Sequence, residues 1–448
     1  MRRTMLTFRA LRIAFATALC GAILAGCQAK LMPTPVVFAG TGIDPVAEAH
    51  AGERTTMSRV FYATDRTPRQ DPQTPAFFYT NKRDFGLRLG VASVDLAPGM
   101  TWEQLHEASL QGKRRENPAP RLTSIDELGP LWLEIPPLQA GPVENAAVAD
   151  RFASQVQAAL DESAVDEIFI FVHGFNTRLD DNCVIAAELH HYLGSQGVFM
   201  SYAWPSRGSL FAYSADKASA AYSVRYFRLF LIYLAERTDA RRINIIAHSA
   251  GAPVAVGAIR ELCLMHYDEG KEAVQSRYRL GQLVLVAPDM DLGVFENAIH
   301  DEMVGVPESM SIYFSTRDRA LDFSAWIYGF ARLGEPLTEL SEGDMAFLRD
   351  HPDVSLIDVA GAEKNHGSWL GHSYFHNDPW VSSDLLMLLR HHVDPAARGL
   401  IKIDEKPIWT FPKDYPERSR AAARRLYQSG GMAGGNGAPV EDESPGDE

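Results

Sequence analysis

Three residue types that together can cleave an ester occur in this chain, each close after an apolar run. Ser249 lies in the pentapeptide AHSAG, which departs from the pattern G-x-S-x-G by Ala247 at the first glycine position. Asp318 ends the run MSIYFSTRD, and His372 lies in GSWLGHSYFH. A serine hydroxyl is a weak nucleophile, so it needs a histidine to accept its proton and a carboxylate to orient that histidine. The pentapeptide alone also occurs by chance, so the elements around it must decide whether Ser249 is catalytic.

Those elements alternate between two periodicities. Short runs rich in β-branched and aromatic residues predict strands, and they read RVFYAT, GLRLGVASVDL, PLWLEI, EIFIFVHG, GVFMSYAWP, RINIIAHS, QLVLVAPD, MSIYFSTRD and VSLIDVAG. Between them, apolar residues recur at helical spacing, as at Ile185, Leu189, Tyr192 and Leu193, or at Tyr226, Leu229, Phe230, Tyr233 and Leu234. Continuous apolar strands that alternate with helices predict an α/β fold, with a mostly parallel central sheet covered by helices on both faces.

The candidate residues follow the carboxyl ends of these strands, where α/β proteins gather their chemistry. The turn His173-Gly174-Phe175 follows one strand, and Ser249, Asp318 and His372 come after later ones. The order serine, acid, histidine is that of the α/β-hydrolases. This agreement in order favours Ser249 as the nucleophile on a tight strand-to-helix turn. Ala247 adds one methyl group there, and Gly251 keeps the other side of the turn open.

Two of the three assignments have competitors nearby. His366 and His376 lie in the same irregular segment as His372, and Asp289 and Asp291 follow the strand before that of Asp318. The two earlier aspartates have an alternative role as caps of the helix expected from Leu292 onward. Asp318 is favoured because its strand is nearer in chain order to the last strand and the histidine.

The tetrahedral intermediate of acyl transfer carries a negative oxygen that needs two fixed donors. We expect the backbone N–H groups of Phe175 and Ala250 to supply them as an oxyanion hole. Gly174 is expected to be small because a side chain there would obstruct close approach.

A longer series of motifs resembles a known family. FYATDR, FVHGFN, YAWPS, YSADKASA, IIAHSAG, LVAPDMD, STRDRAL and GHSYF resemble successive motifs of an uncharacterised bacterial α/β-hydrolase family, esterase- or lipase-like and of unknown function. The motifs span about Arg59 to Leu386. The resemblance implies the α/β-hydrolase fold and supports His372 through GHSYF. The pocket candidates are Trp204, Tyr213, Asp216, Trp326 and Trp369. The resemblance includes the first three of these five, although an aromatic residue after a strand more often belongs to the core.

The N-terminal 26 residues have the parts of a secretory signal: four arginines, a short apolar run and small residues before Cys27. The stretch LAGC resembles the bacterial lipobox, which implies cleavage before Cys27 and acylation of that cysteine. Gln28 in the next position implies the outer membrane. We therefore expect a lipid-anchored envelope protein, because several acyl chains anchor a protein stably where one chain would bind only marginally.

The remaining chain divides simply. Residues 27–57 are predicted to be the lipidated cysteine and a tether, residues 58–415 one hydrolase domain, and residues 416–448 a disordered acidic tail. Cys183 and Cys263 fall on helices that cover opposite sheet faces in α/β-hydrolases, so we predict two free thiols.

The net charge and the spacing of the histidines argue against two classes of function, nucleic-acid binding and zinc binding. Removing residues 1–26, which hold four arginines and no acidic residue, lowers the formal charge from −14 to −18, which argues against a nucleic-acid partner. The pairs His190-His191 and His391-His392 are expected on helix surfaces and do not fit a zinc motif. The sequence thus predicts a membrane-anchored serine hydrolase, without metal or cofactor, that cleaves small-molecule or lipid carboxylic esters or thioesters through an acyl-enzyme. The alternatives are an inactive hydrolase-fold binding or structural lipoprotein of the envelope and, within hydrolysis, a peptidase or amidase.

Overall fold

The computed structural model describes residues 30–46, 54–70, 78–133, 143–207, 213–315, 342–362, 373–403 and 406–428. Within these ranges twelve strands form one sheet in the order β11-β12-β10-β9-β8-β7-β5-β6-β1-β2-β3-β4. The strands are β1 Met57–Pro68, β2 Tyr79–Asp95, β3 Arg121–Leu133, β4 Val143–Glu144, β5 Glu167–Val172, β6 Val198–Tyr202, β7 Arg242–His248, β8 Leu280–Val286, β9 Ser309–Phe314, β10 Val354–Asp358, β11 Ile401–Lys402 and β12 Ile408–Thr410.

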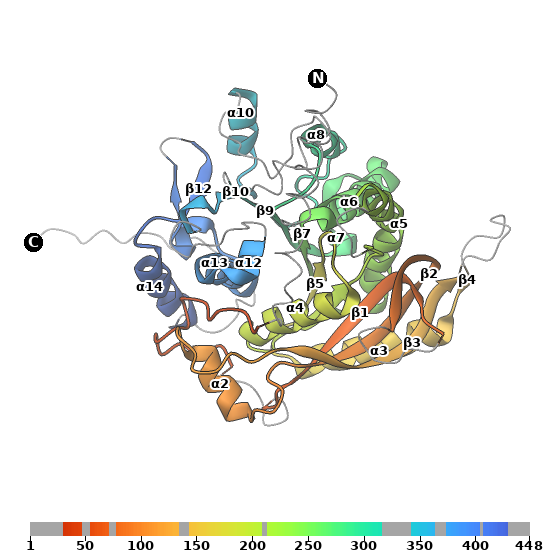
Figure 1. The fold of residues 1–448 in the computed structure, drawn as a ribbon. Coiled ribbons are helices and arrows are strands. Elements are labelled where there is room, and N and C mark those ends of the chain that lie inside the picture. The colour runs from red at the N-terminus through yellow and green to blue at the C-terminus, as the bar shows by residue number, and fades with distance from the viewer. Residues whose placement is uncertain are drawn as a thin grey trace, which may run out of the picture.

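The sheet is parallel through its centre and antiparallel at its two edges. From β1 through β6, β5, β7, β8, β9 and β10 to β12 every neighbouring pair is parallel. The strands β1 to β4 form an antiparallel meander at one edge, and β11 pairs antiparallel with β12 at the other. Each of the nine predicted runs forms a strand, and the predicted fold class is confirmed (Figure 1).

Helices cover both faces of this sheet. They are α2 Trp102–Leu110, α3 Ala146–Glu162, α4 Leu179–Tyr192, α5 Tyr213–Arg237, α6 Ala252–Met265, α7 Lys271–Tyr278, α8 Leu292–His300, α10 Glu342–Asp350, α12 Tyr374–Asn377, α13 Pro379–His391 and α14 Tyr415–Gln428, with the short 3₁₀ turns η5 Ser249–Gly251, η6 Tyr267–Glu269 and η8 Pro395–Arg398.

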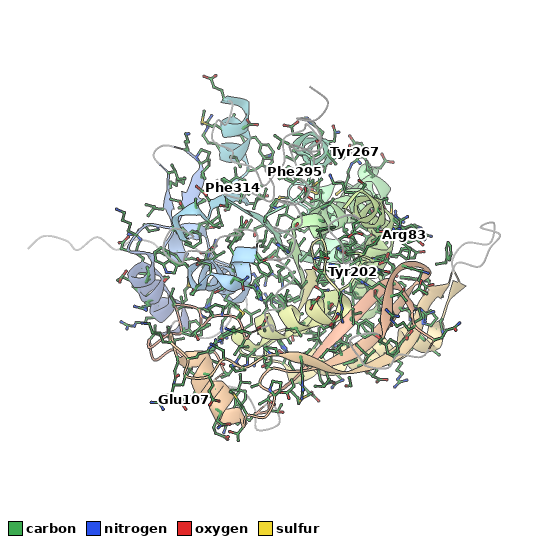
Figure 2. The ribbon with its side chains drawn as sticks, in the orientation of Figure 1. Arg83, Glu107, Tyr202, Tyr267, Phe295 and Phe314 are labelled. Atoms are coloured by element: carbon green, nitrogen blue, oxygen red, sulfur yellow. The ribbon has the colours of Figure 1, made fainter. Side chains whose placement is uncertain are left out.

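Successive side chains of the central strands point to opposite faces of the sheet and therefore pack into two separate cores. On β5, Ile168 and Ile170 join the core beneath α3, α5 and α6, whereas Phe169 and Phe171 join the core beneath α4 and α13. In the first core the ring of Tyr202, labelled in Figure 2, packs on a ring of α5 with centroids 4.6 Å apart. A strand buried on both faces needs no polar alternation, which is why its sequence is continuously apolar.

The two remaining cysteines lie in different cores. Cys183 of α4 and Cys263 of α6 are both buried free thiols, as predicted. Burial raises the pKa of each thiol to about 12, so both stay protonated at neutral pH.

The predicted tether is wrong for residues 30–46, which pack onto the hydrolase body. Leu31, Met32 and Phe38 are at most 2% exposed. The guanidinium of Arg114 donates to the carbonyl oxygens of Leu31 and Met32, at 2.8 and 2.7 Å. Apolar residues in a segment without periodicity can still be buried when side chains elsewhere satisfy its backbone. In Figure 1 this red segment runs between α2 and α14.

The predicted domain end at residue 415 is also too early. Helix α14 continues to Gln428, and its Ser419, Ala422 and Ala423 are buried. Its Arg420 donates to the carbonyl oxygen of Val36 at 3.2 Å, so the N-terminal and C-terminal parts of the described chain are in contact. The rest of the predicted tail, residues 429–448, lies outside the described residues.

A buried ionic cluster joins α13 to the sheet. Asp384 of α13 accepts hydrogen bonds from Arg398 at 2.7 Å and from the hydroxyl of Tyr313 on β9 at 2.6 Å. The side chains of Asp384 and Arg398 are at most 1% exposed. The cluster anchors the segment that follows residue 373 to the strand that precedes residue 315.

We predict that Asp384→Ala lowers the free energy of unfolding by about 3–5 kcal/mol, because it leaves a buried guanidinium without its counter-charge. Asp126→Ala is the matched control: Asp126 is 66% exposed and 4.0 Å from Arg151, so its loss should cost less than about 1 kcal/mol. Urea unfolding followed by circular dichroism measures both. Equal, small effects of the two variants would contradict an anchoring role for the cluster.

Candidate active site

Ser249 lies on a strained turn between a strand and a helix. Strand β7 ends at His248, residues 249–251 form the turn η5, and α6 begins at Ala252 with Pro253 in its first turn. Ser249 has φ of +52° and is 3% exposed. A left-handed backbone costs a residue with a side chain on the order of 1 kcal/mol or more, and such strain concentrates at functional sites. This strand–turn–helix backbone is the one expected from the sequence, and residues 249–251 are called the elbow below.

The elbow abuts the turn that follows β5. A Cβ atom on Gly251 would lie 2.5 Å from the carbonyl oxygen of His173, and one on Gly174 would lie 2.8 Å from the Cβ of Ser249. Both distances are too short for a side chain, so each glycine is required by close approach of two backbones. The parallel register that pairs Val172 of β5 with Ala247 of β7 produces this approach.

The departure from the glycine pattern is accommodated inside the core. Ala247 is completely buried on β7 and belongs to the core beneath α5 and α6. Its methyl group therefore points into packed apolar surroundings, and the turn itself starts two residues later. Only the second glycine of the pattern, Gly251, meets backbone atoms that cannot move aside cheaply.

Phe175 and Ala250, the predicted oxyanion-hole donors, directly follow Gly174 and Ser249 on the two abutting turns. Ala250 is buried within η5, and the side chain of Phe175 is half-buried against the core beneath α5. The fold thus brings together the two segments from which both donors were expected.

Asp318 and His372 lie outside the described residues, as do Cys27, His366, Trp326 and Trp369. The described chain nevertheless places their neighbours. The hydroxyl of Tyr374 donates to the carbonyl oxygen of Tyr313 at 2.8 Å and accepts from the N–H of Ala287 at 3.0 Å. The ring of Phe375 lies 4.9 Å from that of His248. Residues 313–315 and 373–375 therefore lie at the same carboxyl edge of the sheet as Ser249.

The described competitors have different partners. Asp291 accepts from the N–H of Val294 at 3.0 Å and caps α8, which is the alternative role considered for it. Asp289 is buried, and its N–H donates to the carbonyl oxygen of Ser249 at 3.2 Å, so it remains beside the elbow.

His376 contacts helix α4. Its Nε2 atom lies 3.5 Å from a carboxylate oxygen of the buried Glu188. Both residues line a cavity of about 720 Å³ between α4 and the packed N-terminal segment, with Lys30 and Arg114 on its other side. The described contacts of His376 therefore connect it with α4.

Two of the pocket candidates, Trp204 and Asp216, pack or hydrogen-bond near the turn that follows β5. Trp204 is completely buried, its ring stacks on His173 with centroids 5.0 Å apart, and its indole N–H donates to the carbonyl oxygen of His173 at 2.7 Å. Asp216 is also buried and accepts from the hydroxyl of Ser206 at 2.8 Å. The core interpretation of Trp204 is correct. Tyr213 begins α5.

Sequence reasoning missed Arg66 as part of this region. Arg66 is 2% exposed and donates to the carbonyl oxygen of Thr177, in the turn after β5, at 2.8 Å. The available signal was the charged pair Asp65-Arg66 directly after a buried apolar run, a position where an ion needs partners.

Among the described residues, no group of three or more His, Cys, Asp or Glu side chains is arranged to hold a metal ion. Over the same ranges, none of the helices has both the length and the apolar composition needed to cross a bilayer.

Comparison with known proteins identifies the family. Residues 148–390 match the family described as alpha/beta hydrolase of unknown function (DUF900). The chain belongs to this family. It is therefore an α/β-hydrolase, and the resemblance inferred from the motifs is confirmed.

Curated proteins and solved structures give no further assignment beyond the family. No curated protein matches this chain. A solved structure of esterase B from Lactobacillus rhamnosis, inhibited by a tributyrin phosphonate, is 16% identical with a TM-score of 0.23. The match covers 37% of this α/β-hydrolase and 60% of the esterase, so the chain spans less than two thirds of that protein.

We predict that Gly251→Ala destabilises this hydrolase by about 1–3 kcal/mol, because the new methyl group would meet the carbonyl oxygens of His173 and Val172 at 2.5 and 2.6 Å. Gly112→Ala is the control, since a Cβ there would have only an ordinary contact at 3.5 Å. Thermal unfolding of both variants measures the difference. A Gly251→Ala protein as stable as Gly112→Ala would refute the close approach of the two turns.

Proposed function

We propose that this protein is a serine hydrolase that cleaves carboxylic esters or thioesters through an acyl-enzyme. Ser249 is the nucleophile, His372 the general base and Asp318 the carboxylate that orients it. The observation that carries the proposal is the left-handed backbone of Ser249 on a strand-to-helix turn that abuts Gly174. A protein that needed only a buried serine at a strand end would have no reason to keep this strain.

The chemistry follows from these roles. His372 takes the hydroxyl proton as Ser249 attacks the carbonyl carbon, and the N–H groups of Phe175 and Ala250 stabilise the oxygen that becomes negative. His372 then gives the proton to the leaving alcohol or thiol, which departs as the acyl-enzyme forms. Water, activated by the same imidazole, releases the acid and restores Ser249.

Two further features support the assignment. Ser249 precedes α6, whose N-terminus contributes positive potential near a developing anion. Residues 315 and 373 both lie at the edge of the sheet that carries Ser249. Asp318 follows residue 315 by three positions, and His372 directly precedes residue 373.

Membrane attachment through an acylated Cys27 is part of the proposal, with the outer membrane of a bacterial envelope as its place. Lys30 is the first described residue, and Leu31 is buried in the body. Three residues reach at most roughly 11 Å. A lipid at Cys27 would thus hold the hydrolase body close to the bilayer, which favours lipid or other envelope esters as substrates.

We predict that the purified protein reacts with a fluorophosphonate at Ser249 and hydrolyses short-chain p-nitrophenyl esters. Ser249→Ala should abolish labelling and lower kcat at least ~1000-fold, leaving the residual rate that the oxyanion hole and binding supply. Active-site labelling read by peptide mass spectrometry and steady-state kinetics measure these effects. A folded parent protein that resists the probe would instead support the inactive binding or structural alternative.

The histidine and acid assignments can be tested in the same assay. We expect His372→Ala and Asp318→Asn to lose most activity, because the base or its orienting partner is removed. His376→Ala and Asp291→Asn serve as controls, since His376 contacts Glu188 and Asp291 caps α8. Loss of activity in the controls with retention in His372→Ala or Asp318→Asn would move the catalytic role to the competitor.

We predict that Cys27→Ser transfers the protein from the membrane fraction to the soluble envelope fraction of a bacterial host. The substitution removes the thiol that carries the lipid, whereas Cys183→Ser, at a buried thiol of the body, should leave the protein in the membrane fraction. Fractionation with immunoblotting and mass spectrometry of the N-terminal peptide measure both. An unmodified Cys27 in the membrane-bound parent would contradict lipid anchoring.

A further inference from the structure

The turn of residues 173–177, called the oxyanion turn below, has an irregular backbone that the sheet does not hold. Asn176 adopts φ of +57°, and the turn leaves β5 before α4 begins. Buried peptide groups outside regular structure need hydrogen-bond partners from elsewhere. The partners of this turn come from three other segments of the chain.

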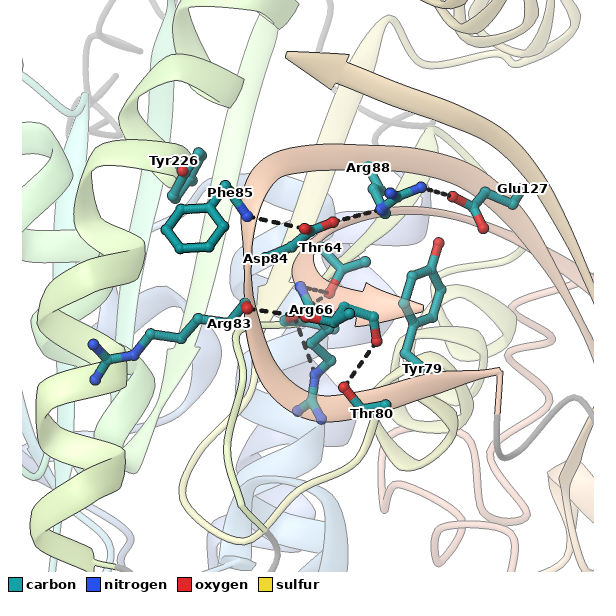
Figure 3. A network of polar contacts seen from close by, with 12 residues as sticks. Thr64, Arg66, Tyr79, Thr80, Arg83, Asp84, Phe85, Arg88, Glu127 and Tyr226 are labelled. Carbon is teal, nitrogen blue, oxygen red and sulfur yellow. Dashed lines mark hydrogen bonds and ion pairs between the residues drawn. The ribbon is translucent and has the colours of Figure 1, made fainter. Parts of the chain in front are cut away.

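Arg66, the last buried residue of β1, contacts one side of the turn. Its Nη2 atom donates to the carbonyl oxygen of Thr177 at 2.8 Å and lies 3.3 Å from Nε2 of His173. Its Nε atom donates to the carbonyl oxygen of Ala203 at 3.3 Å, and Nη1 donates to that of Ser206 at 3.5 Å. Figure 3 shows Arg66 beside Thr64 within the curve of the β1–β2 hairpin. One guanidinium therefore ties the oxyanion turn to the loop after β6.

Ser206 holds the other side. Its hydroxyl accepts from the N–H of Asn176 at 2.8 Å and donates to the carboxylate of Asp216 at 2.8 Å. Asp216 also accepts from the N–H of Arg207 at 2.9 Å, so its position on the first turn of α5 is fixed by two donors. The relay from Asp216 through Ser206 ends on the peptide group that directly follows Phe175.

His173 completes the arrangement as a neutral ring. Burial, together with the charge of Arg66, lowers the pKa of His173 well below its ordinary value. Its Nδ1 atom lies 2.7 Å from the carbonyl oxygen of Gly174, and its Nε2 atom lies 3.1 Å from the carbonyl oxygen of Trp204. Nη2 of Arg66 lies 3.3 Å from the same Nε2 atom, and the carbonyl oxygen of His173 itself accepts from the indole N–H of Trp204. Nδ1 of His173 and the hydroxyl of Ser206 therefore lie against the peptide groups on the two sides of Phe175.

We propose that Arg66 and Ser206, with Asp216 behind Ser206, are positioning residues that set the orientation of the Phe175 peptide for the oxyanion. The proposal rests on the proposed function and adds the residues that prepare its oxyanion hole. A donor helps catalysis only if it is already oriented where charge develops. The motifs FYATDR, YAWPS and YSADKASA, none of which holds a nucleophile, base or acid of the triad, thereby gain a role.

The choice of arginine follows from geometry. A planar guanidinium presents five N–H donors in fixed directions, whereas a lysine ammonium offers three donors on one atom. Arg66 uses this fork to reach carbonyl oxygens of two loops and an imidazole at once. Burial lowers the pKa of Arg66 to about 10, so the group is still charged at neutral pH.

The test combines Ser206→Ala and Arg66→Lys with Ser201→Ala as the matched control. Ser201 is an equally buried serine on β6, but its hydroxyl accepts from Asn182 of α4 and does not contact the oxyanion turn. We expect Ser206→Ala to lower kcat for a p-nitrophenyl ester about 10-fold and Arg66→Lys about 100-fold, with KM changed less than about 3-fold. Fluorophosphonate labelling should slow in parallel, and Ser201→Ala should keep the parent values.

A second measurement does not depend on activity. Hydrogen exchange followed by mass spectrometry should show faster exchange in the peptide spanning residues 173–178 for Ser206→Ala and Arg66→Lys, and unchanged exchange for Ser201→Ala. Unchanged exchange in both variants, or faster exchange with unchanged kcat, would overturn the positioning role. A parent protein without Ser249-dependent turnover would instead overturn the proposed function, whatever the exchange shows.

Discussion

The contact between two backbone turns at the carboxyl edge of the sheet is the constraint on which this site depends. Because β5 and β7 are parallel neighbours, the turn after Val172 and the turn after His248 leave the sheet side by side. No space for a Cβ atom remains at Gly174 or Gly251. Ser249, with its left-handed backbone, lies on one of these two turns, and their approach brings the segments of both expected oxyanion donors together.

Polar groups buried behind these turns make the arrangement specific. A buried guanidinium and carboxylate lose hydration worth several kcal/mol each, and a packed apolar cluster would often serve stability as well. Here the ionic and polar groups satisfy peptide groups of an irregular turn, which apolar side chains cannot do. Arg66, Ser206 and Asp216 come from three different segments, so the turn is specified by tertiary contacts rather than by its own residues.

The ends of the described chain are part of the same structure. The segment of residues 30–46 is fastened by Arg114 and by helix α14, and α13 is fastened to β9 through Asp384. Together with Tyr374, these contacts bring the chain around residues 315 and 373 to the edge that carries Ser249. An anchor at Cys27 would place this body next to a membrane without a long linker.

The sequence by itself determined the parallel sheet, the order of its central strands along the chain, the elbow at Ser249 and the separation of Cys183 from Cys263. These features follow from local periodicity, small residues and chain order, which are readable without contacts. Only the tertiary structure decided which polar residues, and which residues of segments without periodicity, are buried. Leu31, in a segment without periodicity, is buried, and of the histidines expected on a surface His191 is buried and His190 half-buried. Removal of these imidazoles from water lowers the pKa of His190 to about 4 and that of His191 to about 3. Burial of such groups depends on hydrogen-bonding and packing partners that are far away in sequence. A local pattern of residue types does not indicate which distant residues these partners are.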